Sequence, residues 1–422
     1  MYYGWYVVAA CNLVAVMTWG IGVFNQGVFL GYFVAEYGWS RAELSFGPTL
    51  FYVWAGLMGI WIGRLLDRRG PRPILIGGAL ALGAGTVVLG LARAPWHVYV
   101  GFLLLGTGYA GLHTVTLGAI VSRWFVRQRA RARIIPPTFG ASVGGMILAP
   151  LNAGLLESWG GPVAGLTLAV IAIAVVVPLA IWVVKDGPEA VGQRIDGDGP
   201  DAPPADAVSV AHDERDWSVR GALGTRAFWA IALSFHLTMG AQAGFLVHQV
   251  LFLQPTFGFV VAATVVSLTT VMGAVGRVAF AVAGNRWPPR RIASATFLLQ
   301  AAGLAVSALG GAPWVLVVGS ALFGLTMGVV VALAPVVAAD CFGRRSFGRV
   351  YGALYLALQL GSALGALLFG LSASAFESYR PAFAVVSGLL VLAAVGMRWA
   401  VRPPVVPAVA GAGYTRAALW KG

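Results

Sequence analysis

The chain has 422 residues, of which 59% are hydrophobic and 10% charged, and its mean hydropathy is +0.82. A soluble domain of this length cannot bury so many apolar side chains, so the composition excludes a soluble globular protein. The net charge of +13 would suit a nucleic-acid-binding protein. The basic residues lie in short connections between apolar runs, however, as membrane topology requires, so we expect no nucleic-acid partner.

Apolar runs long enough to cross a bilayer recur along the whole chain. A helix of about 20 mostly apolar residues spans roughly 30 Å of hydrocarbon. The sequence predicts twelve such helices, over residues 5–33, 46–66, 73–92, 96–121, 136–156, 162–184, 227–253, 260–284, 291–309, 313–339, 346–373 and 380–401. The first run has neither a basic leader nor a small-residue cleavage site, so it indicates a retained helix rather than a signal peptide.

A polar segment separates the sixth and seventh predicted helices. It is rich in Asp, Gly and Pro and poor in apolar residues, so it cannot bury enough surface to fold by itself. We therefore expect an all-α membrane protein built from two six-helix bundles. The predicted parts are an N-terminal bundle over 1–184, a cytoplasmic linker over 185–225, a C-terminal bundle over 226–402 and a cytoplasmic tail over 403–422.

The two predicted bundles resemble each other in sequence. SRWFVRQRARA after the fourth predicted helix matches ADCFGRRSFGR after the tenth, with Phe125 opposite Phe342 at an offset of 217. A parallel repeat of six helices is typical of transporters whose halves rock about a site between them.

The distribution of Lys and Arg predicts the orientation. With both termini inside, the inner connections and the tail hold 24 of the 28 basic residues, whereas the outer connections hold three, Arg41, Arg93 and Arg380. Connections rich in Lys and Arg stay in the cytoplasm. We therefore expect a multi-pass protein of the inner (cytoplasmic) membrane with both termini in the cytoplasm.

The connection after the second predicted helix carries a recognisable motif. GRLLDRRGPRP places Gly63, Asp67, Arg68, Gly70 and Arg72 in a G-x-x-x-D-R-x-G-x-R spacing, which resembles the signature of the major facilitator superfamily. Asp67 at a helix end can pair with arginines or cap a neighbouring helix, which would hold the cytoplasmic side shut in one state. The alternative is a solvated basic loop that only satisfies topology. We expect Gly63, Asp67, Arg68 and Arg72 to form a gate.

Three further stretches resemble the bacterial monocarboxylate and oxalate–formate transporter branch of that superfamily. They are GWYVVAA, GVFLGYFVAEYGWSRAELS and FGRRSFGRVYG. Within the second stretch, Ser40 and Glu43 are also spaced to form a capping box at the start of the next helix. The resemblance implies a cavity between the bundles that opens alternately to each side, with an arginine of the eighth helix binding the substrate carboxylate.

That arginine corresponds to Arg277. Independently of the resemblance, Arg277 is the one Lys or Arg placed inside a predicted helix, and a charge in the hydrocarbon is costly enough to indicate function. A planar guanidinium can also bind a carboxylate through two parallel hydrogen bonds. The alternative is an arginine that extends its charged end to the membrane interface.

Animal members of the family carry a lysine in the first helix and an aspartate one turn before the arginine. Here Asn25 and Gln26 lie near the first position, and Gly273 occupies the second. All 15 acidic residues lie in connections or at helix ends. No carboxylate is therefore expected at mid-membrane to carry protons, and a proton would have to use a histidine or the substrate.

Other polar side chains are candidates to line the cavity with Asn25. Tyr109 and His113 are one turn apart on the fourth predicted helix, and Tyr355 and Gln359 share a face of the eleventh. His113 can bond the substrate or titrate near neutral pH. Equally, such groups can simply bond a neighbouring helix.

Together these features predict a secondary active or facilitative transporter of small organic anions, in the first place monocarboxylates such as lactate, with proton coupling as one option. The alternative is a major facilitator transporter of another solute, a dicarboxylate, drug or sugar, in which Arg277 is structural. A membrane enzyme or receptor would need a clustered His, Cys or acidic site or a soluble domain. We expect no enzymatic activity, no cofactor and no metal, and a monomer whose partners are the solute, protons and the lipid bilayer.

The charge distribution makes a testable prediction about topology. A cysteine introduced at Ala202 in the linker and one at Pro313 before the tenth predicted helix should react with a membrane-impermeant thiol reagent from opposite sides of the membrane. Labelling of both positions from the same side would contradict the predicted orientation.

Overall fold

The regular structure of the described residues is entirely helical. A computed structural model of the chain describes residues 2–125, 140–197, 217–283, 286–343 and 347–403, without the side chains of Asp67, Thr114, Val115 and Ala283. The first half contains α1 (Gly4–Trp19), η1 (Gly20–Phe24), α2 (Asn25–Tyr37), α3 (Arg41–Arg69), α4 (Pro71–Gly90), α5 (Pro95–Leu112), α6 (Thr114–Trp124), α8 (Ala141–Pro178) and η3 (Leu179–Val183). The second half contains α10 (Arg226–Phe257), α11 (Phe259–Ala283), α12 (Pro289–Leu309), α13 (Pro313–Phe342), α14 (Phe347–Ala375), α15 (Arg380–Gly396) and η7 (Met397–Trp399). Short helices η4 (Pro188–Val191), η5 (Ile195–Gly197) and α9 (Val219–Leu223) lie between the halves in sequence.

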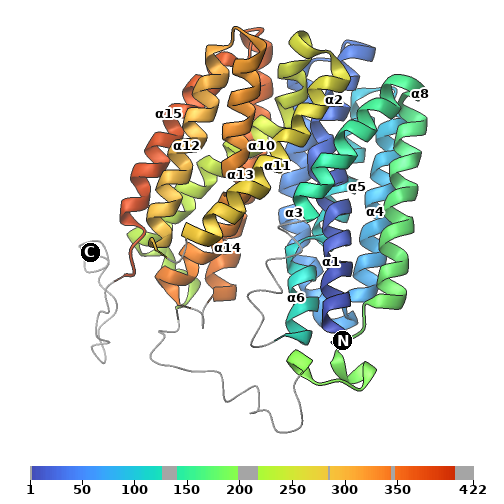
Figure 1. The fold of residues 1–422 in the computed structure, drawn as a ribbon, viewed down its shortest axis with the longest axis vertical. Coiled ribbons are helices and arrows are strands. Elements are labelled where there is room, and N and C mark those ends of the chain that lie inside the picture. The colour runs from blue at the N-terminus through green and yellow to red at the C-terminus, as the bar shows by residue number, and fades with distance from the viewer. Residues whose placement is uncertain (1, 126–139, 198–216, 284–285, 344–346, 404–422) are drawn as a thin grey trace.

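Eleven helical stretches in the described residues are long and apolar enough to cross a membrane. One of them, Ala141–Val183, holds both the fifth and the sixth predicted helices. The chain reverses inside it at Gly160, whose φ of 77° and ψ of 178° lie outside the helical region (Figure 1). A residue with a Cβ atom is strained at such a positive φ, so glycine is needed there. The predicted all-α membrane fold is confirmed, with the fifth and sixth helices joined directly.

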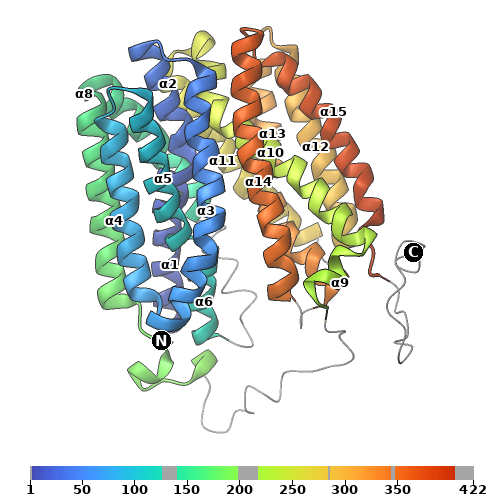
Figure 2. The same cartoon turned by 180° about the vertical axis from the view of Figure 1, so that it is seen from behind.

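The helices form two bundles that stand side by side (Figures 1 and 2). The N-terminal bundle runs from α1 to η3, and the C-terminal bundle runs from α10 to η7. We call the end at which α1 begins and α15 ends the proximal end, and the opposite end the distal end.

Within each bundle, neighbouring helices approach closely at glycines. In the C-terminal bundle, Gly361 and Gly365 of α14 lie against the backbone of His236 and Gly240 of α10, and a Cβ atom on either α14 glycine would overlap a carbonyl group of α10. Small residues are what permit such backbone contact in a membrane, where no hydrophobic effect drives helices together. Each bundle is therefore tightly packed.

The two bundles meet in their distal halves. Polar and glycine contacts there join α2 to α10, α3 to α14 and α8 to α11. They connect Gly27 to Val247 (2.8 Å from a Cβ atom placed on the glycine to the carbonyl oxygen), Thr49 to Ala363 (hydroxyl to carbonyl oxygen, 3.3 Å) and Ser267 to Met146 (hydroxyl to carbonyl oxygen, 2.8 Å).

The bundles separate toward the proximal end. A Cβ atom on Gly56 of α3 would lie 3.5 Å from Cβ of Gln359 on α14, so the helices still touch there. One and two turns further along the same face of α3, no described atom outside that helix lies within 4 Å of a Cβ position on Gly59 or Gly63. The same holds for Gly352 on the facing side of α14. The described structure is thus closed at its distal end and parted at its proximal end (Figure 2).

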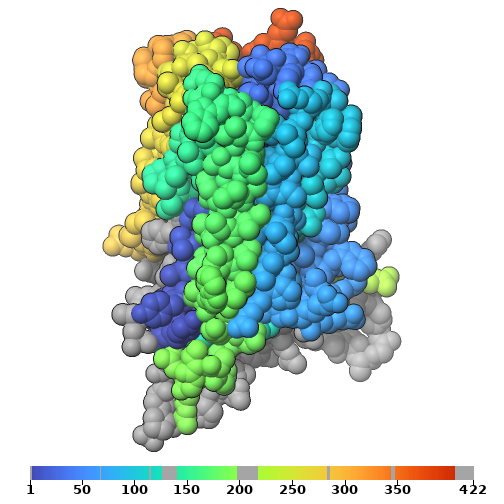
Figure 3. Space-filling model, turned by 90° about the vertical axis from the view of Figure 1, so that its right-hand side faces the viewer, coloured from blue at the N-terminus to red at the C-terminus, as the bar shows by residue number. Residues whose placement is uncertain are grey.

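The residues after η3 cover the proximal end of the N-terminal bundle (Figure 3). The backbone N–H of Tyr3 donates to Oε1 of Gln193 at 2.9 Å, and the hydroxyl of Tyr2 donates to the carbonyl oxygen of Trp124 at 2.5 Å. The beginning of the linker therefore packs against the bundle that precedes it.

The start of α3 differs from the predicted capping box. Ser40 occupies the N-cap position, but its side chain accepts no hydrogen bond from the first turn. The backbone N–H of Ala42 instead donates to Oγ of Ser374 on α14 at 3.0 Å. The capping-box prediction is wrong because the C-terminal bundle satisfies this end of α3.

The α10–α14 crossing makes a testable prediction about stability. Gly365→Ala should lower the thermal unfolding temperature of the purified protein, because overpacking a close contact typically costs about 1–3 kcal/mol. Gly352→Ala in the same helix is the matched control. It meets no neighbouring atom and replaces a flexible residue in a helix, so it should leave the unfolding temperature unchanged or raise it. Equal effects of the two substitutions would contradict the assigned role of the crossing.

Candidate functional site

The first membrane-crossing stretch is interrupted by one wide turn at its centre. η1 is a π-helical turn, and Asn25 and Gln26 follow it directly. Nδ2 of Asn25 donates to the carbonyl oxygen of Gly20 at 3.0 Å, and Nε2 of Gln26 donates to that of Gly22 at 2.6 Å. Both side chains are buried, and neither amide oxygen has a hydrogen-bond partner among the described residues. Two acceptors are therefore left over inside the protein.

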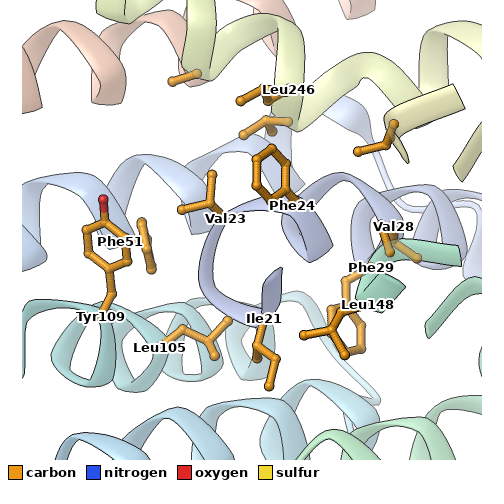
Figure 4. Packing of buried hydrophobic residues seen from close by; sticks show 14 of the residues in the cluster. Ile21, Val23, Phe24, Val28, Phe29, Phe51, Leu105, Tyr109, Leu148 and Leu246 are labelled. Atoms are coloured by element: carbon orange, nitrogen blue, oxygen red, sulfur yellow. The ribbon is translucent and has the colours of Figure 1, made fainter. Parts of the chain in front are cut away.

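Apolar residues from several helices enclose this turn. Figure 4 shows Val23 and Phe24 on the side of Leu246 from α10, whereas Ile21 lies on the opposite side with Leu105 of α5. Single π-helical turns within α-helices occur often at functional sites. The turn lies where the N-terminal bundle meets α10.

A second interruption lies in the fourth predicted helix. It breaks at His113, whose φ of −88° and ψ of −172° are extended, and α6 begins at the next residue. The ring of His113 stacks on that of Tyr109 at 4.4 Å and lies 5.4 Å from that of Trp19. The hydroxyl of Thr18 on α1 donates to the carbonyl oxygen of Val14 at 2.7 Å and lies 3.2 Å from that of Leu112.

Further tyrosines extend these rings across the two bundles. We call Trp19, Tyr52, Tyr109, His113, Tyr351 and Tyr355 the central aromatic group. Tyr355 of α14 lies near Tyr52 of α3 and Tyr109 of α5, and its ring is 6.3 Å from that of Tyr351. Gln359 lies one turn further along α14 and has no partner for its Nε2 among the described residues.

Arg277 lies on α11, half-buried at the contact with α8. Its Nη2 donates a hydrogen bond to Oγ of Ser142 in the N-terminal bundle. A Cβ atom on Gly328 of α13 would lie 2.5 Å from its Nη1 and 2.7 Å from its Cζ, so the guanidinium lies directly over that glycine. Its Nε has no partner among the described residues. The cation therefore bridges the two bundles through a neutral hydroxyl and keeps an unused donor.

The predicted cavity residues fall into two groups. Tyr109, His113 and Tyr355 belong to the central aromatic group, and Gln359 borders it. Asn25 follows Phe24, whose ring lies 6.4 Å from that of Trp19. Arg277 lies on the α8–α11 side and bonds Ser142, two residues before Gly144, which packs against Gly20 of the π-helical turn.

The predicted gate residues lie at the parted proximal end. Arg68 is exposed, and Nε of Arg72 donates to the carbonyl oxygen of Val184 at 2.8 Å, within its own bundle. Gly63 faces open space on α3. The side chain of Asp67 lies outside the described part of the chain. These residues lie at the parted end, and their role as a gate stays a prediction.

Sequence reasoning missed Ser142 and Gly328, the two neighbours of Arg277, because nothing local marks a single Ser or Gly as a contact. It also missed Gln249, whose Nε2 donates to Oγ1 of Thr269 at 2.7 Å and whose Oε1 has no partner among the described residues. A signal for Gln249 was present. At an offset of 223, the pair Asn25-Gln26 matches His248-Gln249 in the internal repeat.

Several curated proteins are similar to part of this chain. The fujikurins efflux protein of Gibberella fujikuroi is 32% identical over 145 residues, which cover 33% of this chain and 30% of that protein. Monocarboxylate transporter 13 of Rattus norvegicus is 30% identical over 37% of this chain and 36% of its own length. The inner membrane transport protein YajR of Escherichia coli is 27% identical over 43% and 41%. Each match spans less than half of the relative.

Two solved structures share the fold over nearly the whole chain. One is a bacterial homologue of the human lysosomal transporter Spinster in an inward-facing, occupied conformation, with a TM-score of 0.73, 18% identity and coverage of 95% of this chain and 97% of that one. The other is the nucleoside transporter NupG, with a TM-score of 0.69, 13% identity and coverage of 95% and 99%. A family model described as Major Facilitator Superfamily matches residues 8–309 and 259–418. With its helical fold, its membrane-crossing stretches and this match, the chain belongs to the Major Facilitator Superfamily.

Proposed function

We propose that this protein carries small organic anions, in the first place monocarboxylates such as lactate, across the inner membrane by alternating access. In this proposal the proximal end faces the cytoplasm, Arg277 binds the substrate carboxylate and the central aromatic group encloses the rest of the solute. The protein acts as a monomer in the bilayer and is a transporter rather than an enzyme.

The proposal rests on the incomplete charge compensation and hydrogen bonding of Arg277. A guanidinium in a membrane-crossing helix is costly unless charge or hydrogen bonds compensate it. Here it has one hydroxyl partner and an Nε without a partner among the described residues, and the sequence predicts all 15 acidic residues in connections or at helix ends. A carboxylate would supply both the missing charge and the missing acceptor, and it fits the planar fork of arginine.

The aromatic side chains suit the rest of a small organic acid. Tyrosine combines an apolar ring with one polar hydroxyl, and such groups can bury a short carbon chain while bonding a substituent on it. Oδ1 of Asn25, which has no partner in the described part of the chain, would suit a hydroxyl donor such as that of lactate.

The arrangement of contacts supports alternating access. The bundles are tightly packed internally and parted at one end, so a rigid rotation of one bundle against the other would close the proximal end and open the distal end. The excess of Lys and Arg in the proximal connections favours the cytoplasmic side for that end.

The rival proposal is transport of another solute with Arg277 as a structural link to Ser142. The names of the relatives include an efflux protein as well as a monocarboxylate transporter, so both substrate classes occur among similar chains. Substitution of Arg277 separates the two proposals.

Arg277→Ala should weaken carboxylate binding by on the order of tenfold to a hundredfold, because charge-assisted hydrogen bonds contribute about 1.5–3 kcal/mol each. Arg277→Lys keeps the charge but loses the planar fork, so it should bind nearly as poorly. The measurement is binding and uptake of radiolabelled lactate, with thermal unfolding as the folding control. Near-normal affinity in a folded Ala variant would show that the substrate carboxylate binds elsewhere. Near-normal affinity in the Lys variant alone would show that only the positive charge of Arg277 is needed.

Gly328 provides an independent test of the same site. In Gly328→Ala the added methyl group would lie 2.5 Å from Nη1 of Arg277 and 2.5 Å from the carbonyl oxygen of Gly273. It should displace the guanidinium and weaken carboxylate binding at least tenfold, or about 1.4 kcal/mol, with thermal unfolding as the control for the backbone contact. The double variant with Arg277→Ala should bind no worse than Arg277→Ala alone, since the group being displaced is already absent. Fully additive losses would show that Gly328 acts independently of Arg277.

A further inference from the structure

A fully buried histidine lies at the distal contact between the two bundles. His248 of α10 has no exposed surface. Its Nδ1 lies 3.1 Å from the hydroxyl of Tyr379, and its Nε2 lies 2.9 Å from the carbonyl oxygen of Ala366 on α14. Oγ of Ser45, from α3 of the other bundle, lies 3.4 Å from Nε2. One imidazole therefore contacts elements of both bundles.

These partners determine where the proton of His248 lies. The carbonyl oxygen of Ala366 can only accept, so Nε2 carries the hydrogen and donates it. Nδ1 is then an acceptor, and the hydroxyl of Tyr379 donates to it. The hydroxyl of Ser45 already donates to the carbonyl oxygen of Arg41 at 2.5 Å, which leaves its oxygen facing Nε2–H. The site fits a neutral imidazole with all of its polar atoms paired.

A second proton does not fit this closed arrangement. Nδ1–H would force the hydroxyl of Tyr379 to accept, and the hydrogen of that hydroxyl would lose its partner. The guanidinium of Arg41 lies 5.4 Å from the centre of the Tyr379 ring, so a new cation would face an existing one. On α14, the ring of Phe369 stacks on the imidazole at 6.4 Å and offers no charge to compensate it. No carboxylate among the described residues contacts the site to compensate the charge.

The contact with Ser45 links the protonation of His248 to the separation of the bundles, because Ser45 belongs to the bundle that moves away when the distal end opens. Opening would then admit water to His248, and a hydrated imidazolium is far less costly than a buried one. We propose that His248 is a proton-binding site in the distal gate, which is closed with the neutral imidazole and is stabilised in its open form when a proton binds. In the orientation proposed above, acid outside the cell would open the outer gate.

The size of the pH effect on the opening of the distal gate follows from proton linkage. The closed state binds fewer protons at His248 than the open state, so the ratio of open to closed molecules rises as pH falls. For a single proton, the ratio changes by at most about tenfold per pH unit. This inference does not depend on which solute is carried.

A distance measurement across the distal end tests the proposal. Ser158 in the N-terminal bundle and Ala312 in the C-terminal bundle are exposed at that end. Spin labels on cysteines at these two positions, with the buried Cys11 and Cys341 replaced by alanine, report the opening by pulsed electron paramagnetic resonance in nanodiscs. A longer distance should gain population between pH 8 and pH 5. An unchanged distribution over this range would overturn the proposal.

The variant His248→Gln and a matched control identify the residue. Glutamine can donate to Ala366 and accept from Tyr379 but does not titrate, so His248→Gln should abolish the pH response. His236→Gln removes the other histidine of α10, which lies about three turns from His248 along the helix and is bonded through Nδ1 to the carbonyl oxygen of Ala357 at 2.8 Å. It should leave the response intact. An unchanged response in His248→Gln, or its loss in His236→Gln alone, would refute the assignment.

Tyr379→Phe gives a second test that retains the histidine. Without the hydroxyl, the neutral imidazole loses the donor to Nδ1 in the closed state, so the closed state is weakened and the transition should shift to higher pH. A transition at the wild-type pH would show that the Tyr379 hydroxyl does not hold the gate and would contradict the hydrogen-bond pattern on which the proposal rests.

Discussion

The hydrocarbon core of a membrane offers no water to backbone N–H and C=O groups, and the structure depends on that constraint. Regular helices satisfy it within each segment, so irregular backbone is tolerated only where other protein groups replace the lost bonds. At the π-helical turn, the amides of Asn25 and Gln26 bond the carbonyl oxygens of Gly20 and Gly22. At the break beside His113, the hydroxyl of Thr18, which donates to the carbonyl oxygen of Val14 at 2.7 Å, also lies 3.2 Å from that of Leu112. Both irregularities thereby gather polar side chains in the interior, near the central aromatic group.

Helix contacts within a bundle and helix contacts between the bundles differ in how easily they can be broken. Inside a bundle, glycines bring backbones together, as Gly361 and Gly365 do against α10, and such contacts cannot slide without separating the helices. Between bundles, some contacts are single hydrogen bonds such as that of Ser267 with Met146, which water can replace at small net cost. The difference explains how each bundle can move as a unit while the contact between them changes.

Two of the contacts between the bundles pair the same kinds of side chain. In each, a basic side chain of the C-terminal bundle meets a serine of the N-terminal bundle, Arg277 with Ser142 and His248 with Ser45. A hydroxyl can accept or donate but carries no charge, so it holds the basic group without neutralising it. A carboxylate at Arg277, or a proton at His248, would therefore change the charge balance of a contact that also joins the bundles. Occupancy and movement are coupled through these serines in the proposals made here.

The sequence by itself determined the membrane class, the positions of the helices and the likeness to the superfamily, because these follow from local hydrophobicity and from a motif within one connection. It also singled out Arg277, since one cation inside an apolar run is visible without any neighbour. Tyr109 and His113 were predicted to share a face because helical periodicity alone brings them together, and their rings do stack. The direct joining of the fifth and sixth helices at Gly160 was not foreseen, although its glycine is present in the sequence.

Only the tertiary structure decided what these residues meet. Ser142 and Gly328 come from helices distant in sequence, and their contact with Arg277 depends on how α8 and α13 pack against α11. The expected capping box failed for the same reason, because Ala42 bonds Ser374 of the opposite bundle. The hydrogen-bonded tautomer of His248 likewise follows from Ala366 and Tyr379, which no local pattern connects to it. Hydrophobic periodicity specifies which segments are helices, whereas the pairing of single polar groups depends on packing angles and close approaches that arise only when the two bundles assemble.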